Sequence, residues 1–396
     1  TGTEMDAWVS LLVALLLVVV ASVLFFLRGS SKKKVPQEPV EEKETPVKAK
    51  KKPGKNQKSV PTKPKQPQRE SHKRYLCTLK NHTNEVVHCE FSPCGNYLAT
   101  ASEDRTLLLY KLKTIMEPSH PHRRVNILGD VPGRFCISID GKYVVLSMQM
   151  TTQINVYGIS SKGGKLLKQI RAQPHHKQPI NAVDFSSNLK YMLSCSSTDT
   201  RINLWDIKGN VIHSFTTNQM SNQMARFSPD SKFIAIATIS TETKLWELKE
   251  DKKGGFVSLE KAIQGSSSGA HSKTVTCLDF TSDSKQLVTG SMDGSWKLWN
   301  IDVNYKLNED ARCIRTSNEP NGKEIQYLRV SPNNQRLATV SNDTTIIMWD
   351  LTNGSIVDTI ESAHDAKITA VSWSRNSDVL ASSSEDTRVH LWNAKI

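Results

Sequence analysis

The chain has 396 residues, with 52 Lys and Arg against 39 Asp and Glu, so its formal net charge is +13. The charge is unevenly placed, because residues 28–74 carry +11 and residues 75–396 carry only +4. These values argue against a basic nucleic-acid-binding fold and indicate a basic arm instead. The seven cysteines are widely spaced and include no C-x-x-C pair, which argues against a disulfide framework and a zinc site.

The first hydrophobic element is residues 9–27, a run of 19 residues without a charge. As a helix it would span about 28 Å, close to the hydrocarbon core of a bilayer. The alternative is a cleaved signal peptide, whose apolar region is normally about 7–15 residues long and ends in a small-x-small site. Here the run is longer and ends in Phe25, Phe26 and Leu27. We therefore expect an uncleaved transmembrane signal-anchor helix.

The flanks of this helix predict its orientation. Glu4 and Asp6 precede it, whereas Arg28 and three lysines at 32–34 follow it. Because the positive flank stays in the cytosol, residues 1–8 should face the lumen or the exterior, and everything after residue 28 the cytosol. Residues 1–4 stand before Met5 and are interpreted either as a leader upstream of the true start or as residues left by cloning.

Residues 28–74 contain seven prolines and no aromatic residue. Such a segment buries too little apolar surface to offset its chain entropy, so we expect a disordered Lys/Pro-rich linker. It is either a solvated spacer or a segment attracted to anionic lipid or to RNA phosphates. Without interleaved aromatic residues, any RNA contact would be electrostatic and salt-sensitive. The candidate phosphate- or lipid-binding residues are Lys50, Lys51, Lys52, Lys55 and Lys58.

From residue 75 onward the sequence repeats itself. In five copies a turn Asp stands six residues before an aromatic residue, and in four of them a His stands 28 or 29 residues before it. The aromatic markers lie 41–53 residues apart, and they are Tyr110, Tyr157, Trp205, Trp246, Trp299, Trp349 and Trp392. A period of about 40–45 residues ending in Trp-Asp is typical of WD repeats, each of which forms one four-stranded blade. The sequence thus predicts an all-β fold, a seven-bladed WD-repeat β-propeller at 75–396, preceded by a single transmembrane helix and a disordered basic linker.

Each good copy should contain a buried hydrogen-bond relay. In the WD family the loop His, a strand Ser or Thr, the turn Asp and the Trp indole bond one another inside the blade. Carried over here, the relay residues are His82, Ser102, Asp104, His176, Ser197, Asp199, Trp205, His271, Ser291, Asp293, Trp299, Ser341, Asp343, Trp349, His364, Ser384, Asp386 and Trp392. The first relay ends in Tyr110, which lacks an indole donor and should weaken it. A His beside Asp and Ser also resembles a hydrolase triad, but its recurrence in several blades favours a structural network.

The two ends of the repeat region predict how the ring closes. The last copy stops at Trp392 after three strands, and an alternating segment at 75–79 precedes the first copy. We expect this segment to complete the last blade, which removes an exposed sheet edge.

Beyond the generic repeat, the chain resembles the transducin beta-like protein 2 family. The segments that carry the resemblance are 217–222, 252–256 and 291–306, together with the hydrophobic N-terminus and the basic linker. The resemblance implies a single-pass protein of the endoplasmic reticulum membrane with a cytosolic propeller. It also implies a role in stress signalling through an ER-resident kinase that controls translation initiation.

The leading hypothesis for function is a non-catalytic adaptor, in which the propeller rim binds proteins and the helix confines them to the membrane. Fold-level analogy places the rim candidates just before each turn Asp, at Glu103, Thr198, Met292, Asn342 and Glu385. The alternatives are an RNA- or ribosome-binding factor acting through the linker, and an exchange factor or regulator for a small GTPase. An enzyme is not expected, because the sequence has no P-loop, H-E-x-x-H or G-x-G-x-x-G motif. No cofactor, metal or small-molecule substrate is predicted.

Overall fold

The computed structural model describes residues 71–395 except 161–162, 172–175, 262–269 and 306–308. These residues belong to one compact unit, Pro64–Ile396. The predicted membrane helix at 9–27 and the predicted linker up to residue 70, with its candidate lysines, lie outside the described residues. Among the residues that are described, no helix is long and apolar enough to cross a membrane.

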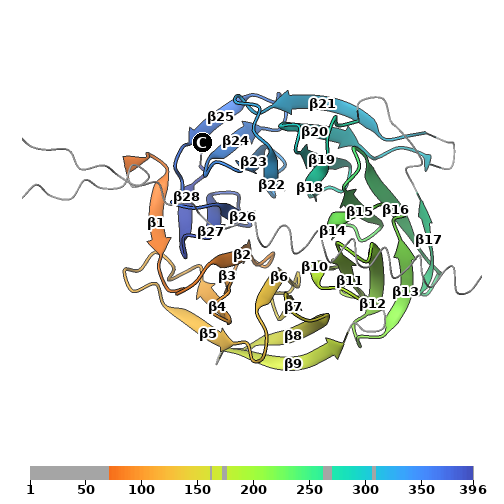
Figure 1. The fold of residues 1–396 in the computed structure, drawn as a ribbon, viewed down its shortest axis with the longest axis horizontal. Coiled ribbons are helices and arrows are strands. Elements are labelled where there is room, and N and C mark those ends of the chain that lie inside the picture. Colours follow the sequence, from red (N-terminus) through yellow and green to blue (C-terminus); the bar gives the residue numbers. More distant parts are fainter. Residues whose placement is uncertain (1–70, 161–162, 172–175, 262–269, 306–308, 396) are drawn as a thin grey trace, which may run out of the picture. The chain divides into compact units, whose positions relative to one another are not determined.

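Seven antiparallel sheets of four strands each stand around a common axis in the described part of the chain (Figure 1). The all-β, seven-bladed propeller is therefore confirmed. The innermost strands are β2 (Val86–Phe91), β6 (Pro132–Ile137), β10 (Ile180–Phe185), β14 (Asn222–Phe227), β18 (Val275–Phe280), β22 (Ile325–Val330) and β26 (Ile368–Trp373). These strands open blades 1 to 7 in that order, and each is followed in the sequence by the second strand of its own blade.

The remaining strands follow outward in each blade. The second strands are β3 (Tyr97–Ser102), β7 (Tyr143–Met148), β11 (Tyr191–Ser196), β15 (Phe233–Thr238), β19 (Gln286–Ser291), β23 (Arg336–Ser341) and β27 (Val379–Ser384). The third strands are β4 (Thr106–Lys111), β8 (Gln153–Ser160), β12 (Arg201–Asp206), β16 (Thr243–Glu250), β20 (Ser295–Asn300), β24 (Ile346–Asp350) and β28 (Val389–Asn393). The outermost strands are β5 (His122–Asn126), β9 (Gly163–Arg171), β13 (Val211–Thr216), β17 (Phe256–Lys261), β21 (Arg312–Asn318), β25 (Ile356–Ile360) and β1 (Tyr75–Leu79).

The ring closes through β1, which lies beside β28 at the edge of blade 7 (Figure 1). The register pairs Tyr75 with Trp392 and continues to the other end of the strand. The side chain of Arg74 donates to the backbone carbonyls of Asn393 and Lys395 at 3.0 and 3.1 Å, and it also pairs with Asp358 of blade 6. The first strand of the propeller thus supplies the outer edge of its last blade, as the alternating segment 75–79 predicted.

The place of a strand within its blade explains its residue pattern. In the second strand β19, five of the six residues are buried, because neighbouring blades pack against both faces of the sheet. In the outermost strand β21, exposed and half-buried residues alternate, because only one face meets protein. Large side chains fill the spaces between blades: the rings of Trp296 and Trp349, from blades 5 and 6, meet edge to face at 5.7 Å. The hydrophobic core therefore runs around the ring from blade to blade.

Candidate binding face

One face of the ring is built from two kinds of connection, and we call it the relay face. These connections are the turns between second and third strands and the loops that lead into the innermost strands. The rim candidates all lie on these turns, one residue before the turn Asp. Thr198 and Asn342 are exposed, while Glu103, Met292 and Glu385 are partly buried. The structure therefore brings the five candidates onto one face, spread over five blades.

The relay of blade 5 runs from this face into the sheet. Nδ1 of His271 lies 3.2 Å from Oδ2 of Asp293, and its Nε2 lies 2.8 Å from Oγ1 of Thr289. The indole of Trp299 donates to the same hydroxyl at 2.9 Å. Blades 3 and 7 hold the same chain of bonds, formed by His176, Asp199, Ser194 and Trp205, and by His364, Asp386, Ser382 and Trp392.

The direction of each bond follows from the Trp and the Asp. An indole N–H can only donate, so the Thr289 oxygen accepts from Trp299. The ionised Asp293 can only accept, so the proton of the neutral His271 ring lies on Nδ1 and the Thr289 hydrogen points to Nε2. Nε2 is then the acceptor nitrogen, and Nδ1 carries the proton that is donated to the Asp. The relay hydroxyls of Ser194, Thr289 and Ser382 belong to residues that are 0 % exposed. They are structural groups between a His and a Trp, and no substrate reaches them as it would reach a hydrolase nucleophile.

The relay hydroxyl is not the one that the spacing suggested, and this prediction is corrected. In place of Ser102, Ser291, Ser341 and Ser384, the bonds run to Thr100, Thr289, Thr339 and Ser382, two residues earlier. In place of Ser197, they run to Ser194. Alternate residues of a strand share a face, so in the four blades with a two-residue offset both hydroxyls lie on the same side of the blade. The later one sits at the strand end, where Ser291 donates to the carbonyl of Lys273 and supports the turn.

Blade 1 keeps its relay although Tyr110 replaces the Trp. His82 lies 3.0 Å from Asp104 and 2.7 Å from the hydroxyl of Thr100. Tyr110 is buried, and its hydroxyl donates to the side-chain oxygen of Asn81 at 3.2 Å. The phenol thus finds its acceptor on the residue before His82, which the repeat pattern does not predict.

Two blades without the His use a carboxylate in its place. In blade 6 the hydroxyl of Thr339 accepts from the Trp349 indole and donates to Glu319 at 3.1 Å, so a buried acid replaces the imidazole. In blade 2 the buried Asp130 accepts bonds from the backbone N–H groups of Met150 and Thr151, at 3.0 Å each. Both acids lie on the loop that carries the His elsewhere, which is the signal that could have identified them from sequence.

The turn Asp of each relay also stabilises the next residue, whose backbone is in the left-handed conformation. Arg105, Thr200, Gly294, Thr344 and Thr387 follow the turn Asp, and all have φ between 56° and 77°. Only one is Gly, so the other four are strained. The carboxylate offsets this strain by accepting the N–H of the residue after the strained one, as Asp199 does from Arg201 at 3.0 Å. Burial raises the pKa of Asp199, but bonds from His176, Arg201 and Lys177 outweigh it and bring the pKa down to about 2.

A pH dependence of stability follows from His271. Burial lowers the pKa of His271 to about 4, whereas an unfolded His titrates near 6.5. The unfolded state therefore binds the proton first, and stability should fall as pH drops from about 6.5 to 4, by up to about 3 kcal/mol. Thermal melts across this range should show a shallower loss for His271→Gln than for the wild type. Parallel curves for the two proteins would contradict this assignment.

A second set of residues lines the central channel and was not predicted. Each innermost strand contributes one residue at the equivalent position, two before the Ser or Thr that follows the strand. We call this set the inner ring; it consists of Glu90, Cys136, Asp184, Arg226, Asp279, Arg329 and Ser372. Several of its members bond the next blade: Asp184, Asp279 and Ser372 accept the backbone N–H of Phe227, Val330 and Phe91 at 2.8, 2.9 and 2.9 Å.

Charge pairing completes the inner ring. The guanidinium of Arg226 lies 2.7 Å from Asp279 and 3.9 Å from both Glu90 and Asp184. Burial raises the pKa of Glu90 to about 8, and the charge of Arg226 opposes this shift. The space left within this group is about 20 Å³, room for a single water molecule. The inner ring therefore fastens the blades to one another at the axis.

Comparisons with known proteins agree with this geometry. Residues 191–393 match the β-propeller family described as nucleolar protein 10-like, N-terminal domain, and residues 73–111 and 167–206 match the WD domain, G-beta repeat. The chain belongs to the WD-repeat β-propeller family. The matched residues include both ends of the ring and the relay residues of blades 1, 3, 5 and 7.

Similar WD-repeat proteins cover most of this propeller. Transducin beta-like protein 2 of Homo sapiens is 29 % identical over 79 % of the chain and 70 % of its own length. The Mus musculus protein of the same name is 29 % identical over 94 % of the chain and 85 % of its own length. The transcriptional corepressor LEUNIG_HOMOLOG of Arabidopsis thaliana is 23 % identical over 79 % of the chain and 36 % of its length. The resemblance to the transducin beta-like protein 2 family is thus confirmed.

Proposed function

We propose that this WD-repeat protein is a non-catalytic adaptor that holds partner proteins at the cytosolic surface of the endoplasmic reticulum. The observation that carries the proposal is the relay face, where buried His–Asp pairs fix the turns that present the rim side chains. A surface fixed in advance loses little conformational entropy when it binds, which favours recognition of other proteins. The likeness to transducin beta-like protein 2 supports a scaffold role.

The membrane part of the proposal rests on sequence. The uncharged run at 9–27 and the basic residues that follow it support a single-pass anchor with a cytosolic propeller. The resemblance to the transducin beta-like protein 2 family supports the endoplasmic reticulum as the membrane and an ER-stress kinase among the partners. Proximity labelling from the full chain, compared with a chain lacking residues 1–28, tests both points. We expect ER-surface proteins around the full chain and their loss from the shortened one; identical neighbours would contradict the anchor.

The proposed orientation makes a prediction about glycosylation. Three N-x-S/T sites lie in the propeller, at Asn81, Asn342 and Asn353. The structure leaves Asn342 and Asn353 exposed, so both would be accessible acceptors in the lumen. A cytosolic propeller should carry no glycan, and glycosidase treatment of the protein from mammalian cells should leave its mass unchanged. A mass decrease that Asn342→Gln and Asn353→Gln abolish would overturn the orientation.

A further inference from the structure

The most exposed large apolar side chains are concentrated on one part of the relay face. Leu128, Met150 and Met220 are 87, 75 and 85 % exposed, more than any other large apolar side chain in the described part of the chain. All three lie on relay-face connections of blades 2 and 4, on either side of blade 3. Ile239, 41 % exposed, stands on the turn of blade 4. We call these four residues the apolar patch.

Hydrogen bonds link the connections that carry the patch. In blade 2 the N–H of Gln149 donates to the carbonyl of Val131 at 2.9 Å, joining the turn of Met150 to the loop of Leu128. In blade 4 the N–H of Ile239 donates to the carbonyl of Ser221 at 3.0 Å, next to Met220. The loop of Met220 also contacts blade 3, where the N–H of Asn222 donates to the carbonyl of Ser197 at 3.2 Å. The exposed side chains therefore stand on connections that are held in place.

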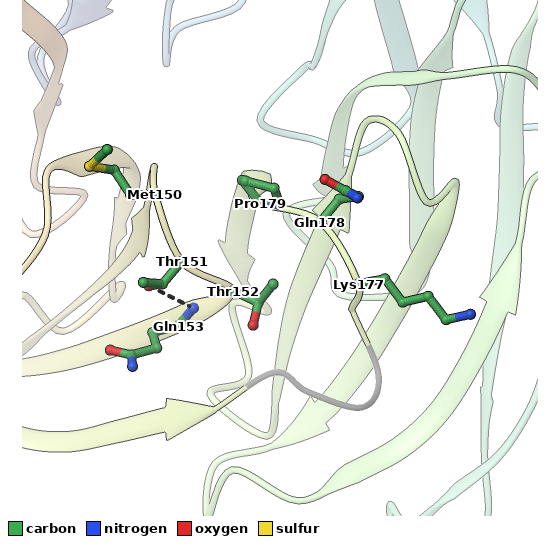
Figure 2. A pocket seen from close by; sticks show the side chains of 7 residues that line it. All are labelled: Met150, Thr151, Thr152, Gln153, Lys177, Gln178 and Pro179. Atoms are coloured by element: carbon green, nitrogen blue, oxygen red, sulfur yellow. Dashed lines mark hydrogen bonds between the residues drawn. The ribbon is translucent and has the colours of Figure 1, made fainter.

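A hollow of about 570 Å³ lies between blades 2 and 3 within this region (Figure 2). Met150 and Thr152 border it on one side, and Gln178, Pro179 and Lys177 on the other. Its size accommodates one or two large side chains of a partner. Met150 of the apolar patch thus borders a depression in which an apolar anchor can be buried.

The charges of the relay face show which partner fits. On the described connections of blades 2 to 4, Lys177 is the exposed charged side chain, while the connections of blades 5, 6, 7 and 1 expose Lys273, Lys323, Glu361, Asp365, Lys367, Glu85 and Arg105. Around the patch the polar residues are Gln, Asn, Ser and Thr, which suit the amides of a peptide backbone. The same described connections hold no cluster of basic residues for anionic lipid and no exposed aromatic side chain for base stacking or a membrane interface.

We propose that the relay face over blades 2 to 4 binds an uncharged peptide segment of a partner protein through large apolar anchors. This inference rests on the proposed adaptor function and adds the chemistry of the partner. Large exposed apolar patches with polar rims mark interaction sites, and flexible Met side chains adapt to the anchors that they meet. The charged half of the face is left free for a second, charge-driven contact.

Panning a phage library of random 12-residue peptides on the unit 64–396, which contains every strand of the ring, tests the inference. We expect enriched peptides with large apolar residues and little net charge. Their affinity, measured by fluorescence polarisation, should fall at least tenfold in the double variant Met150→Glu, Met220→Glu. Val257→Glu is the matched control, because Val257 is 59 % exposed on the outermost strand of blade 4, away from the relay face. All variants are checked for an unchanged melting temperature.

Three results would overturn the inference: no enrichment, enrichment of strongly charged peptides, or equal binding to the double variant. Flotation with phosphatidylcholine vesicles provides a further arm. Binding of the unit to vesicles that the double variant loses would assign the patch to a membrane and contradict a peptide partner. The adaptor proposal is tested separately, because it is contradicted if proximity labelling finds no specific neighbours of the protein. If the double variant keeps the same neighbours as the wild type, only the proposed role of the apolar patch is contradicted.

Discussion

Arg226→Met should destabilise the propeller even more than the loss of a relay carboxylate. The side chain of Arg226 is 17 % exposed, and its guanidinium stands among Asp279, Asp184 and Glu90 of the inner ring. Removing one partner of a buried ion pair leaves the other charges uncompensated and costs about 3–5 kcal/mol. For a domain of this size the melting temperature should fall by roughly 5 to 15 °C. Differential scanning calorimetry of the unit 64–396 measures this change.

The pH dependence separates charge loss from packing loss in this variant. Without Arg226 the pKa values of the neighbouring carboxyls should rise, and protonating these carboxyls relieves their mutual repulsion. The loss of stability in Arg226→Met should therefore be smaller at pH 5 than at pH 7.5. Arg226→Lys, which keeps the charge, should recover part of the stability. Arg312→Met, at an exposed position of β21, is the matched control and should leave the melt unchanged. An Arg226→Met protein that melts like the wild type would show that the inner ring does not hold the blades.

Asp293→Ala should also cause a large loss of stability, smaller than that of Arg226→Met. Asp293 accepts bonds from His271, from the backbone N–H of Ser272 and from both the N–H and the hydroxyl of Ser295. Leaving buried donors without an acceptor costs about 1–3 kcal/mol each, so we expect a total of about 2–4 kcal/mol. Urea unfolding followed by tryptophan fluorescence gives the difference directly.

Asp343→Ala is the comparison that makes this result specific. Asp343 occupies the same turn position in blade 6, but its partners are Thr345 and the ammonium of Lys323, which is 43 % exposed. An ion pair with so exposed a lysine contributes about 0–1 kcal/mol, so this variant should lose clearly less. Equal losses at the two positions would count against a special role for the His–Asp pair.

The fold could be predicted because the same residue pattern recurs in several repeats of the sequence. The turn Asp and the Trp stand at constant separation along one hairpin, and this spacing follows from strand geometry alone. The relay was predicted less completely, because Thr289 and Ser291 lie on the same face of β19 and residue type cannot choose between two hydroxyls. The choice depends on depth: the residue inside the sheet meets both His271 and Trp299.

The inner ring could not be predicted from the sequence for a different reason. Its seven positions hold acids, arginines, a Cys and a Ser, so no single residue type marks them. Such charges look like ordinary surface residues until the ring places them around one axis, where Arg226 of blade 4 meets Asp279 of blade 5 and Glu90 of blade 1. Complementarity between different repeats is a property of the closed ring, and a comparison of each repeat with the next does not detect it. The anchor and linker stay predictions from composition.

The pairing of β1 with β28 also determines when the propeller can complete its folding. Thr78 and His390 bond each other across 312 residues of chain, so the seventh sheet joins the earliest and the latest strands of the propeller to be translated. Blades 1 to 6 take all their strands from contiguous sequence and can form on the ribosome. Blade 7 has to wait until residues 389–393 have emerged, because β1 has no partner before then. Until then β1 is a free strand with an open edge, and closing such a long loop is slow. Ring closure is therefore the last step in forming the propeller, and until it takes place β1 is exposed to pairing with strands of other chains.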